Sequence, residues 1–575
     1  MAIFICAICG LTALPLTVNG AAGDNLIVNN TTVTEADTTH LSNGNTNAAV
    51  EVSNSGFYSG TNVTLTGTSN AGGALGQNAL RTTTGGTFNL INSTLSTSGT
   101  ANNSIAIILS GSAVGLLRDV NVNTVGGVSS YAINVSGSSA LTMIGGTIST
   151  NSNSASGINL NGAATAHLEN VEMKMAMASG LFLQGTSVVT GSDVRVVVNR
   201  GNSIHAIDLR GGSRVELSDI YVHNSGQAGR GIFVTGTSTL NVTGGVIITS
   251  GSYGYGVTLS NSSTGRLAGV AVTVLNEGDQ VGVLAETYST LTVVSSSVHT
   301  TGSAIAAALS SANGTLILED TTLTTEGPAA YGLLVTGNGT AEMTGGSASA
   351  AQGAGIGVIG STSRVTVSGA DITGTVGLFV SNANPNGDIR VDLGDATQVH
   401  NGVSIVNNSH LTLSVTGNSS VDGEVTASGS SNSVINFDNS TLSGNVTASD
   451  HAVIDLTVSG SDSTLLGDIA QNDEAAVTVT LDDNATGKGG YHGGNLITGG
   501  DSVWAFTKDS AADLIDNHGI IHLGTPDNYI ALHSDTISGD GTWFFPVNSD
   551  TGAKSTVTGS TAADSHPRGK LIVSG

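Results

Sequence analysis

The sequence predicts an all-β fold: a right-handed, single-stranded parallel β-helix that ends in a C-terminal capping segment. Three observations lead to this prediction. The 575 residues include 80 glycines and only 10% charged residues, which leaves little material for solvated helices. Short runs of Val, Ile and Leu alternate with Ser, Thr, Asn and Gly, a composition typical of strands joined by turns. One sequence pattern also recurs about every 25 residues, as expected of a solenoid.

The chain begins with an apolar run over residues 2–16 that resembles the core of a secretory signal peptide. Small residues at Gly20, Ala21 and Ala22 offer a cleavage site. Both cysteines, Cys6 and Cys9, lie inside the run. We therefore expect residues 1–22 to be a signal peptide and the exported chain to contain no thiol.

The repeat is a small residue followed by alternating apolar positions, which predicts one turn of a β-helix with about three short strands. An apolar spacing of two, rather than 3.6, disfavours a helical solenoid. Residues one and three places after the small residue, such as Ile232 and Val234, should point inward, whereas Asp208 and Arg210 should point outward. The small residues themselves should line a crowded corner. They are Ala49, Ala79, Ala106, Ala132, Gly157, Gly180, Ala206, Gly231, Gly256, Gly282, Ala307, Gly332, Gly357, Gly377 and Gly402.

Beyond Gly402 the repeat becomes shorter, and its recurring pattern lies at residues 423–427, 444–448 and 467–471. The shorter spacing predicts a coil with tighter turns. Aromatic side chains then gather near the C-terminus. They are Trp504, Phe506, Trp543, Phe544 and Phe545. We accordingly expect a β-helix over residues 23–501 and a stable cap over residues 502–575.

This last segment resembles the membrane-proximal end of the pertactin-like, adhesin-type passenger domain of bacterial autotransporters. The matching residues are 502–504 (SVW), 510–514 (SAADL), 517–523 (NHGIIHL), 537–544 (ISGDGTWF) and 571–575 (LIVSG). In that family the segment acts as an intramolecular chaperone during secretion, and an outer-membrane translocator barrel follows it. The resemblance implies that the barrel is missing from this chain, which stops at Gly575.

The resemblance further implies export through the periplasm to the cell surface or the medium. The expected function is that of an adhesin or virulence factor that binds a host or bacterial cell-surface protein or glycan, with self-association as another possibility. A formal charge of −26 argues against nucleic acid as a partner. No cofactor is expected.

The alternative function is a secreted β-helix enzyme that acts on polysaccharide, which would need paired acid and base groups on one face. Glu169, Glu216, Glu319 and Glu342 fall near one phase of the repeat, but they are turns apart. We therefore expect no catalytic residue.

Two short motifs favour structural interpretations over catalytic or metal-binding ones. The triplet 500–502 (GDS) resembles the nucleophile motif of esterase passengers, yet that motif opens its domain, so a turn is expected here. His518 and His522 would align for a metal only on a helix. In a strand they should be two separate surface histidines, so no metal site is expected.

A basic cluster interrupts the otherwise acidic repeats. Five of the eleven arginines (Arg195, Arg200, Arg210, Arg214 and Arg230) fall within three turns, together with His205 and His223. His205, Arg230 and Tyr255 each precede a small corner residue and should stack in one column. Arg210, Arg214, Arg230, Tyr255 and His205 are therefore the candidate ligand-binding residues, suited to an anionic glycan or a carboxylate-bearing partner. The alternative is that Asp193, Asp208, Glu216 and Asp219 merely neutralise these charges.

Overall fold

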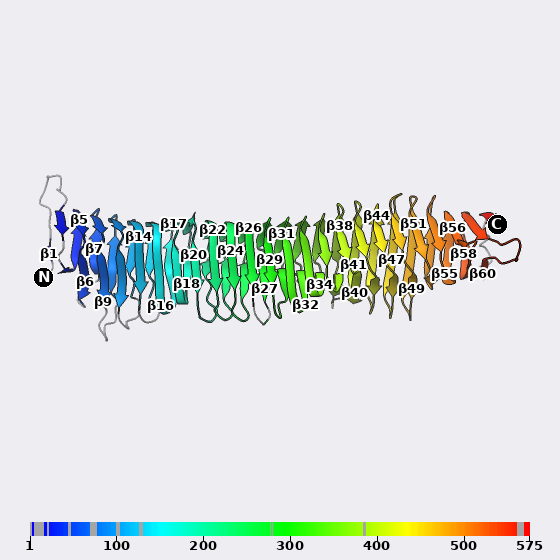
Figure 1. The fold of residues 1–575 in the computed structure, drawn as a ribbon, viewed down its shortest axis with the longest axis horizontal. Coiled ribbons are helices and arrows are strands. Elements are labelled where there is room, and N and C mark those ends of the chain that lie inside the picture. The colour runs from blue at the N-terminus through cyan, green and yellow to red at the C-terminus, as the bar shows by residue number, and fades with distance from the viewer. Residues whose placement is uncertain are drawn as a thin grey trace. The chain divides into compact units, whose positions relative to one another are not determined.

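The structure is a computed structural model. It describes residues 3–4, 16–19, 22–43, 48–68, 77–98, 104–125, 130–275, 278, 280–382, 384, 387–559 and 569–574. All regular structure in these residues is β-strand, which confirms the all-β prediction (Figure 1). No helix in the described ranges could span a membrane. Cys6, Cys9, Gly20 and Ala21 lie outside the described residues, so the signal peptide stays a prediction.

The chain divides into two compact units, Met1–Ala304 and Ile305–Gly575. In the first unit each strand pairs in parallel with its counterpart one turn further along the chain. The strands that matter for the site are β18 (Glu172–Leu183), β21 (Ile207–Leu209), β23 (Arg230–Thr235), β25 (Tyr255–Ser260) and β27 (Val281–Glu286). Their register aligns Ile207, Ile232, Val257 and Val283, and all four side chains are fully buried. The predicted inward positions are confirmed.

The corner before each of these strands is as crowded as predicted. A Cβ atom added to Gly231 would lie 2.6 Å from the Gly256 carbonyl oxygen, and one added to Gly256 would lie 2.4 Å from the Gly282 carbonyl oxygen. Both distances are shorter than any real contact between carbon and oxygen. At these two turns the corner therefore admits only glycine.

The second unit repeats this arrangement, with one correction to the predicted corner series. Gly332 is followed at the corner by Gly355, not by Gly357, because Leu333 pairs with Ile356. Gly357 points outward, where a Cβ atom would meet the ring of Tyr331. Glycines at alternate positions in residues 353–357 made the two assignments indistinguishable in sequence.

Tighter turns follow in the second unit, as the shorter repeats predict. The strands β40 (Val403–Asn407), β43 (Val425–Ala427), β46 (Val446–Ala448) and β49 (Ile469–Gln471) pair in succession. Their register aligns Val403 with Val425, Val446 and Ile469. All four side chains are buried, so the inward pattern of the core persists although the turns are shorter.

The aromatic C-terminal segment continues the coil of the second unit with further parallel turns. They are built from β54 (Val503–Phe506), β55 (Ser510–Asn517), β56 (Ile520–Thr525), β58 (Ala531–Ser538), β59 (Thr542–Pro546) and β61 (Lys570–Ser574). Trp504 is fully buried, with its ring 5.6 Å from that of Tyr491 and 6.1 Å from that of Phe506. A short antiparallel pair joins β56 to β57 (Asn528–Tyr529).

Candidate ligand-binding site

The first unit brings His205, Arg230 and Tyr255 into one column, as the repeat predicts. Arg230 is the register partner of Tyr255 in the β23–β25 pair. The amide of Ala206 donates to the carbonyl oxygen of Arg230 at 3.0 Å, which places His205 at the same corner one turn earlier. Each of these residues directly precedes the small residue that occupies the crowded inner position of the corner. The three side chains therefore point away from the core of the coil.

Arg230 is held between aromatic rings rather than by a carboxylate. Its guanidinium carbon lies 4.5 Å from the ring centroid of Phe233 and 5.3 Å from that of Tyr255. Its Nε donates to Thr258 Oγ1 at 3.1 Å. No ion pair within 4 Å involves Arg230 among the described residues, and burial lowers the pKa of this guanidinium. A partly desolvated guanidinium with unused N–H groups is suited to a carboxylate ligand.

His205 is a neutral, buried imidazole in this cluster. Its side chain is about nine-tenths buried, and its ring lies 4.7 Å from that of Phe233. Burial lowers the pKa of His205 to about 3, and the charges of Arg230 and Arg210 add to this shift. Nη1 of Arg230 lies 3.5 Å from Nε2 of His205. A guanidinium only donates, so Nε2 faces it as the acceptor and Nδ1 carries the hydrogen.

Arg210 is paired with a carboxylate of this chain. Its Nε and Nη2 donate to the two carboxylate oxygens of Asp208, at 3.0 and 2.8 Å. Burial raises the pKa of the Asp208 carboxyl, and the bound guanidinium opposes that shift. The Arg210 guanidinium carbon also lies 5.1 Å from the ring centroid of Phe182. This bidentate pair is the neutralising arrangement that the sequence left open as the alternative.

Arg214 lies apart from the column. Gly211 and Gly212 turn the chain at φ +73° and +98°, so that Arg214 begins the next strand, β22 (Arg214–Asn224). There it forms an ion pair with Glu216. Of the five candidate residues, the structure brings together His205, Arg210, Arg230 and Tyr255, and places Arg214 on a different strand of the turn.

Two aromatic residues in this cluster, Phe182 and Phe233, were not singled out from the sequence. Each lies two places after a corner glycine, Gly180 or Gly231. Their register aligns them with Asp208 in one outward column. The same corner series that gave the His205 column would have revealed this second one, had outward positions been compared turn by turn.

The four candidate carboxylates do not form pairs with one another. In the first unit, Glu169 Oε1 lies 2.9 Å from Nε2 of His167, and Glu216 pairs with Arg214. In the second unit, the register partner of Glu319 is Thr344 and that of Glu342 is Ile317. Within each unit the two glutamates stand two positions apart along their strands. No glutamate of this set is therefore the register partner of another.

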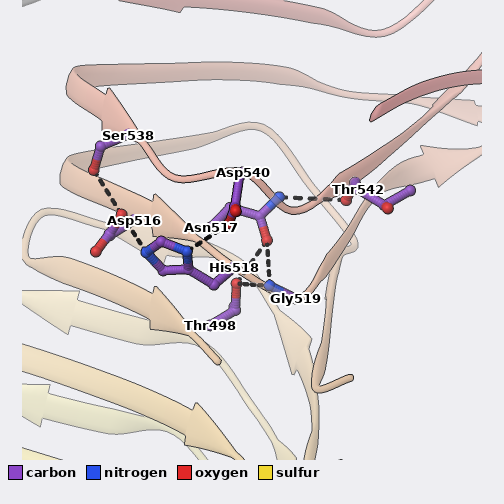
Figure 2. Close-up of polar contacts among 8 residues, drawn as sticks. All are labelled: Thr498, Asp516, Asn517, His518, Gly519, Ser538, Asp540 and Thr542. Atoms are coloured by element: carbon purple, nitrogen blue, oxygen red, sulfur yellow. Dashed lines mark hydrogen bonds and ion pairs between the residues drawn. The ribbon is translucent and has the colours of Figure 1, made fainter. Parts of the chain in front are cut away.

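The C-terminal segment over residues 502–575, the predicted cap, holds a separate polar cluster around Asn517 and His518 (Figure 2). His518 Nδ1 lies 2.7 Å from an Asp540 carboxylate oxygen, and its Nε2 lies 3.3 Å from one of Asp516. The hydrogen bond to Asp540 raises the pKa of His518. His518 thus links two consecutive turns.

His522 lies apart from this cluster and stacks on Phe544 with a ring separation of 4.5 Å. The two histidines therefore have separate environments. No group of three or more metal-ligating side chains occurs in the ranges the structure describes. Residues 499–502 form the turn before β54, in which the Ser502 amide donates to the Gly499 carbonyl oxygen at 3.1 Å.

Comparison with a protein-family model supports the fold. A family model described as "Right handed beta helix region" matches residues 156–323, which include the strands that carry the site. A chain in the cryo-EM structure of the Vag8–C1 inhibitor complex is similar, with 18% identity and a TM-score of 0.45. That alignment covers 93% of this chain and 99% of the other. No curated protein matches the chain. The predicted right-handed parallel β-helix, the fold of the passenger family that the sequence resembles, is confirmed.

Proposed function

We propose that this chain is a surface-displayed autotransporter passenger that acts by binding, as an adhesin or virulence factor, and not by catalysis. The C-terminal segment supports this proposal by its resemblance to passenger domains, and the β-helix fold agrees with it. The proposed contact is the cluster of His205, Arg230 and Tyr255 on the outer surface of the first unit. Its partner would be a carboxylate-bearing glycan or protein on a host or bacterial cell.

The observation that carries the binding role is the state of Arg230. An arginine of the outer face normally meets either water or a carboxylate, as Arg210 and Arg214 do here. Arg230 instead lies partly buried between Phe233 and Tyr255, with Thr258 as its neutral acceptor. Glu286 and Asp208 act on this guanidinium only at longer range. A ligand carboxylate would pair with it directly and keep the cation–π contacts.

The test is binding of the purified chain to an array of glycans and host surface proteins, with Arg230→Ser as the variant. Arg214→Ser is the matched control, because Arg214 is paired with Glu216 on another strand. We expect Arg230→Ser to weaken binding to acidic ligands at least tenfold and to flatten its salt dependence, while Arg214→Ser leaves both nearly unchanged. Equal effects of the two variants would refute this contact.

The same preparation tests the absence of catalysis. Incubation with acidic and neutral polysaccharides should release no reducing or unsaturated ends over hours. Sustained release that rises with protein concentration would refute the binding function and favour a polysaccharide-active enzyme.

A further inference from the structure

A polar cavity opens beside the His205 column on the first unit. It has a volume of about 250 Å³ and is lined in part by Ser179, Phe182, Asn202, His205, Asp208 and Arg210. Small-molecule pockets commonly span about 300 to 1,000 Å³, so this cavity has room for a single ring-sized group. Arg230 does not line it. The cavity therefore adjoins the proposed carboxylate contact and shares His205 with it, but does not include Arg230.

The recess arises from an irregular corner of the coil. Register pairs join the equivalent corner segments 150–158, 175–181 and 198–207 of three successive turns. By subtraction these segments span eight, six and nine steps, so the middle one is the shortest. It also carries small side chains at Ala178 and Ser179, both of which line the cavity. A short corner between two longer ones leaves a hollow.

The wall of the cavity offers fixed hydrogen-bonding groups with little net charge. Arg210 holds both oxygens of Asp208, and each oxygen retains a second lone pair as an acceptor. The charges of this pair cancel. The imidazole of His205 is neutral, because burial lowers its pKa to about 3. Asn202 and Ser179 add neutral donors and acceptors.

Phe182 supplies an apolar surface in the same wall, below the guanidinium of Arg210. A pyranose ring presents hydroxyl groups that both donate and accept, together with apolar C–H faces. It thus matches a small cavity with a rigid acceptor pair, neutral amide and hydroxyl groups and an aromatic ring. A free carboxylate would meet the acceptor oxygens of Asp208, which disfavours an acidic sugar here.

The geometry points to a saccharide-binding subsite in this cavity that takes a neutral sugar residue. Asp208 accepts hydrogen bonds from its hydroxyl groups, and Arg210 acts as the residue that positions Asp208. The use of this subsite in cell-surface attachment rests on the proposed function. The binding itself depends only on the cavity. Because the lining has no net charge, affinity should be nearly independent of ionic strength.

The experiment measures binding of methyl glycosides of glucose, galactose, mannose and N-acetylglucosamine to the purified chain by saturation-transfer NMR and calorimetry. Methyl glucuronide serves as the acidic comparison. We expect at least one neutral glycoside to bind, with affinity unchanged between about 0.05 and 0.5 M salt. Failure of all four neutral glycosides, or selective binding of the glucuronide, would overturn the proposal.

Two variants locate the binding. Ser179→Leu fills the cavity and Asn202→Ala removes a polar lining group, and each should weaken the neutral glycoside at least tenfold. Thr322→Leu, at an exposed strand position in the other unit, is the matched control. Unchanged affinity in both cavity variants would overturn the proposal. Arg230→Ser separates the two hypotheses, because it should weaken the binding of acidic ligands at least tenfold and leave the binding of the neutral glycoside unchanged.

Discussion

Asn517 should be among the most sensitive single positions of the cap. Its side chain is fully buried between two turns. Its Oδ1 accepts from the Thr498 hydroxyl at 2.7 Å and from the Gly519 amide at 3.1 Å, and its Nδ2 donates to the Thr542 carbonyl oxygen at 3.3 Å (Figure 2). Asn517→Ala removes all three bonds at once.

The expected loss of folding free energy depends on which hydrogen bonds each partner of Asn517 keeps in the variant. The Gly519 amide keeps a longer contact of 3.3 Å to Thr498 Oγ1, so its loss is partial. The Thr498 hydroxyl and the Thr542 carbonyl lose a buried partner, at about 1 to 1.5 kcal/mol each. The space of the missing carboxamide adds about 1 kcal/mol. The total is about 3 to 4 kcal/mol, or a urea midpoint about 1.5 to 2 M lower for a slope of about 2 kcal/mol/M.

Tryptophan fluorescence is a specific assay for this change, because Trp504 and Trp543 are the only two tryptophans and both lie in the cap. Thr498→Val removes the hydrogen bond to Asn517 and the longer contact to the Gly519 amide, and should cost about 1 kcal/mol. Asn528→Ala, at an exposed position, should cost less than that. A loss below about 1 kcal/mol for Asn517→Ala would refute the reasoning that this buried amide joins the turns.

Three further predictions concern pH, the corner and the order of unfolding. The pKa of His518 is raised in the folded chain, so its stabilising effect is complete below its unfolded pKa of about 6.5 and is lost as pH rises through the folded value. As pH rises above about 6.5, the urea midpoint of the C-terminal segment should therefore fall more steeply in the native chain than in His518→Gln, and parallel profiles would contradict this. Gly231→Leu should lower the stability of the first unit by more than about 3 kcal/mol in denaturant melts monitored by hydrogen exchange, since even its Cβ atom meets backbone at 2.6 Å; retention of native protection would disprove the corner argument. Proteolysis during partial unfolding should leave a fragment that contains Trp504 and Trp543, whereas a protected N-terminal half would exclude a stabilising cap.

The sequence by itself determined the class of fold and most of the inward positions. In each repeat apolar residues alternate with polar ones, and a small residue recurs at the same place. A parallel β-helix is the fold that buries these apolar residues, because each turn packs on the next. The same repeat placed His205, Arg230 and Tyr255 in one column, because register in a parallel coil follows from spacing along the chain. Gly357 shows where this fails. Alternate glycines at 353–357 satisfy the same spacing, and only the pairing of Leu333 with Ile356 selects Gly355.

Only the tertiary structure decided which charges are partnered. Asp208 and Glu216 are each two places from an arginine in sequence, and both pair with it, yet Arg230 pairs with neither and lies between aromatic rings. The choice depends on side-chain direction and burial across three turns, which spacing does not encode. The cavity beside His205 also depends on a corner two or three steps shorter than its neighbours. The cavity forms where the flanking turns pack around this shorter corner, so it is a property of the assembled coil and not of any one repeat.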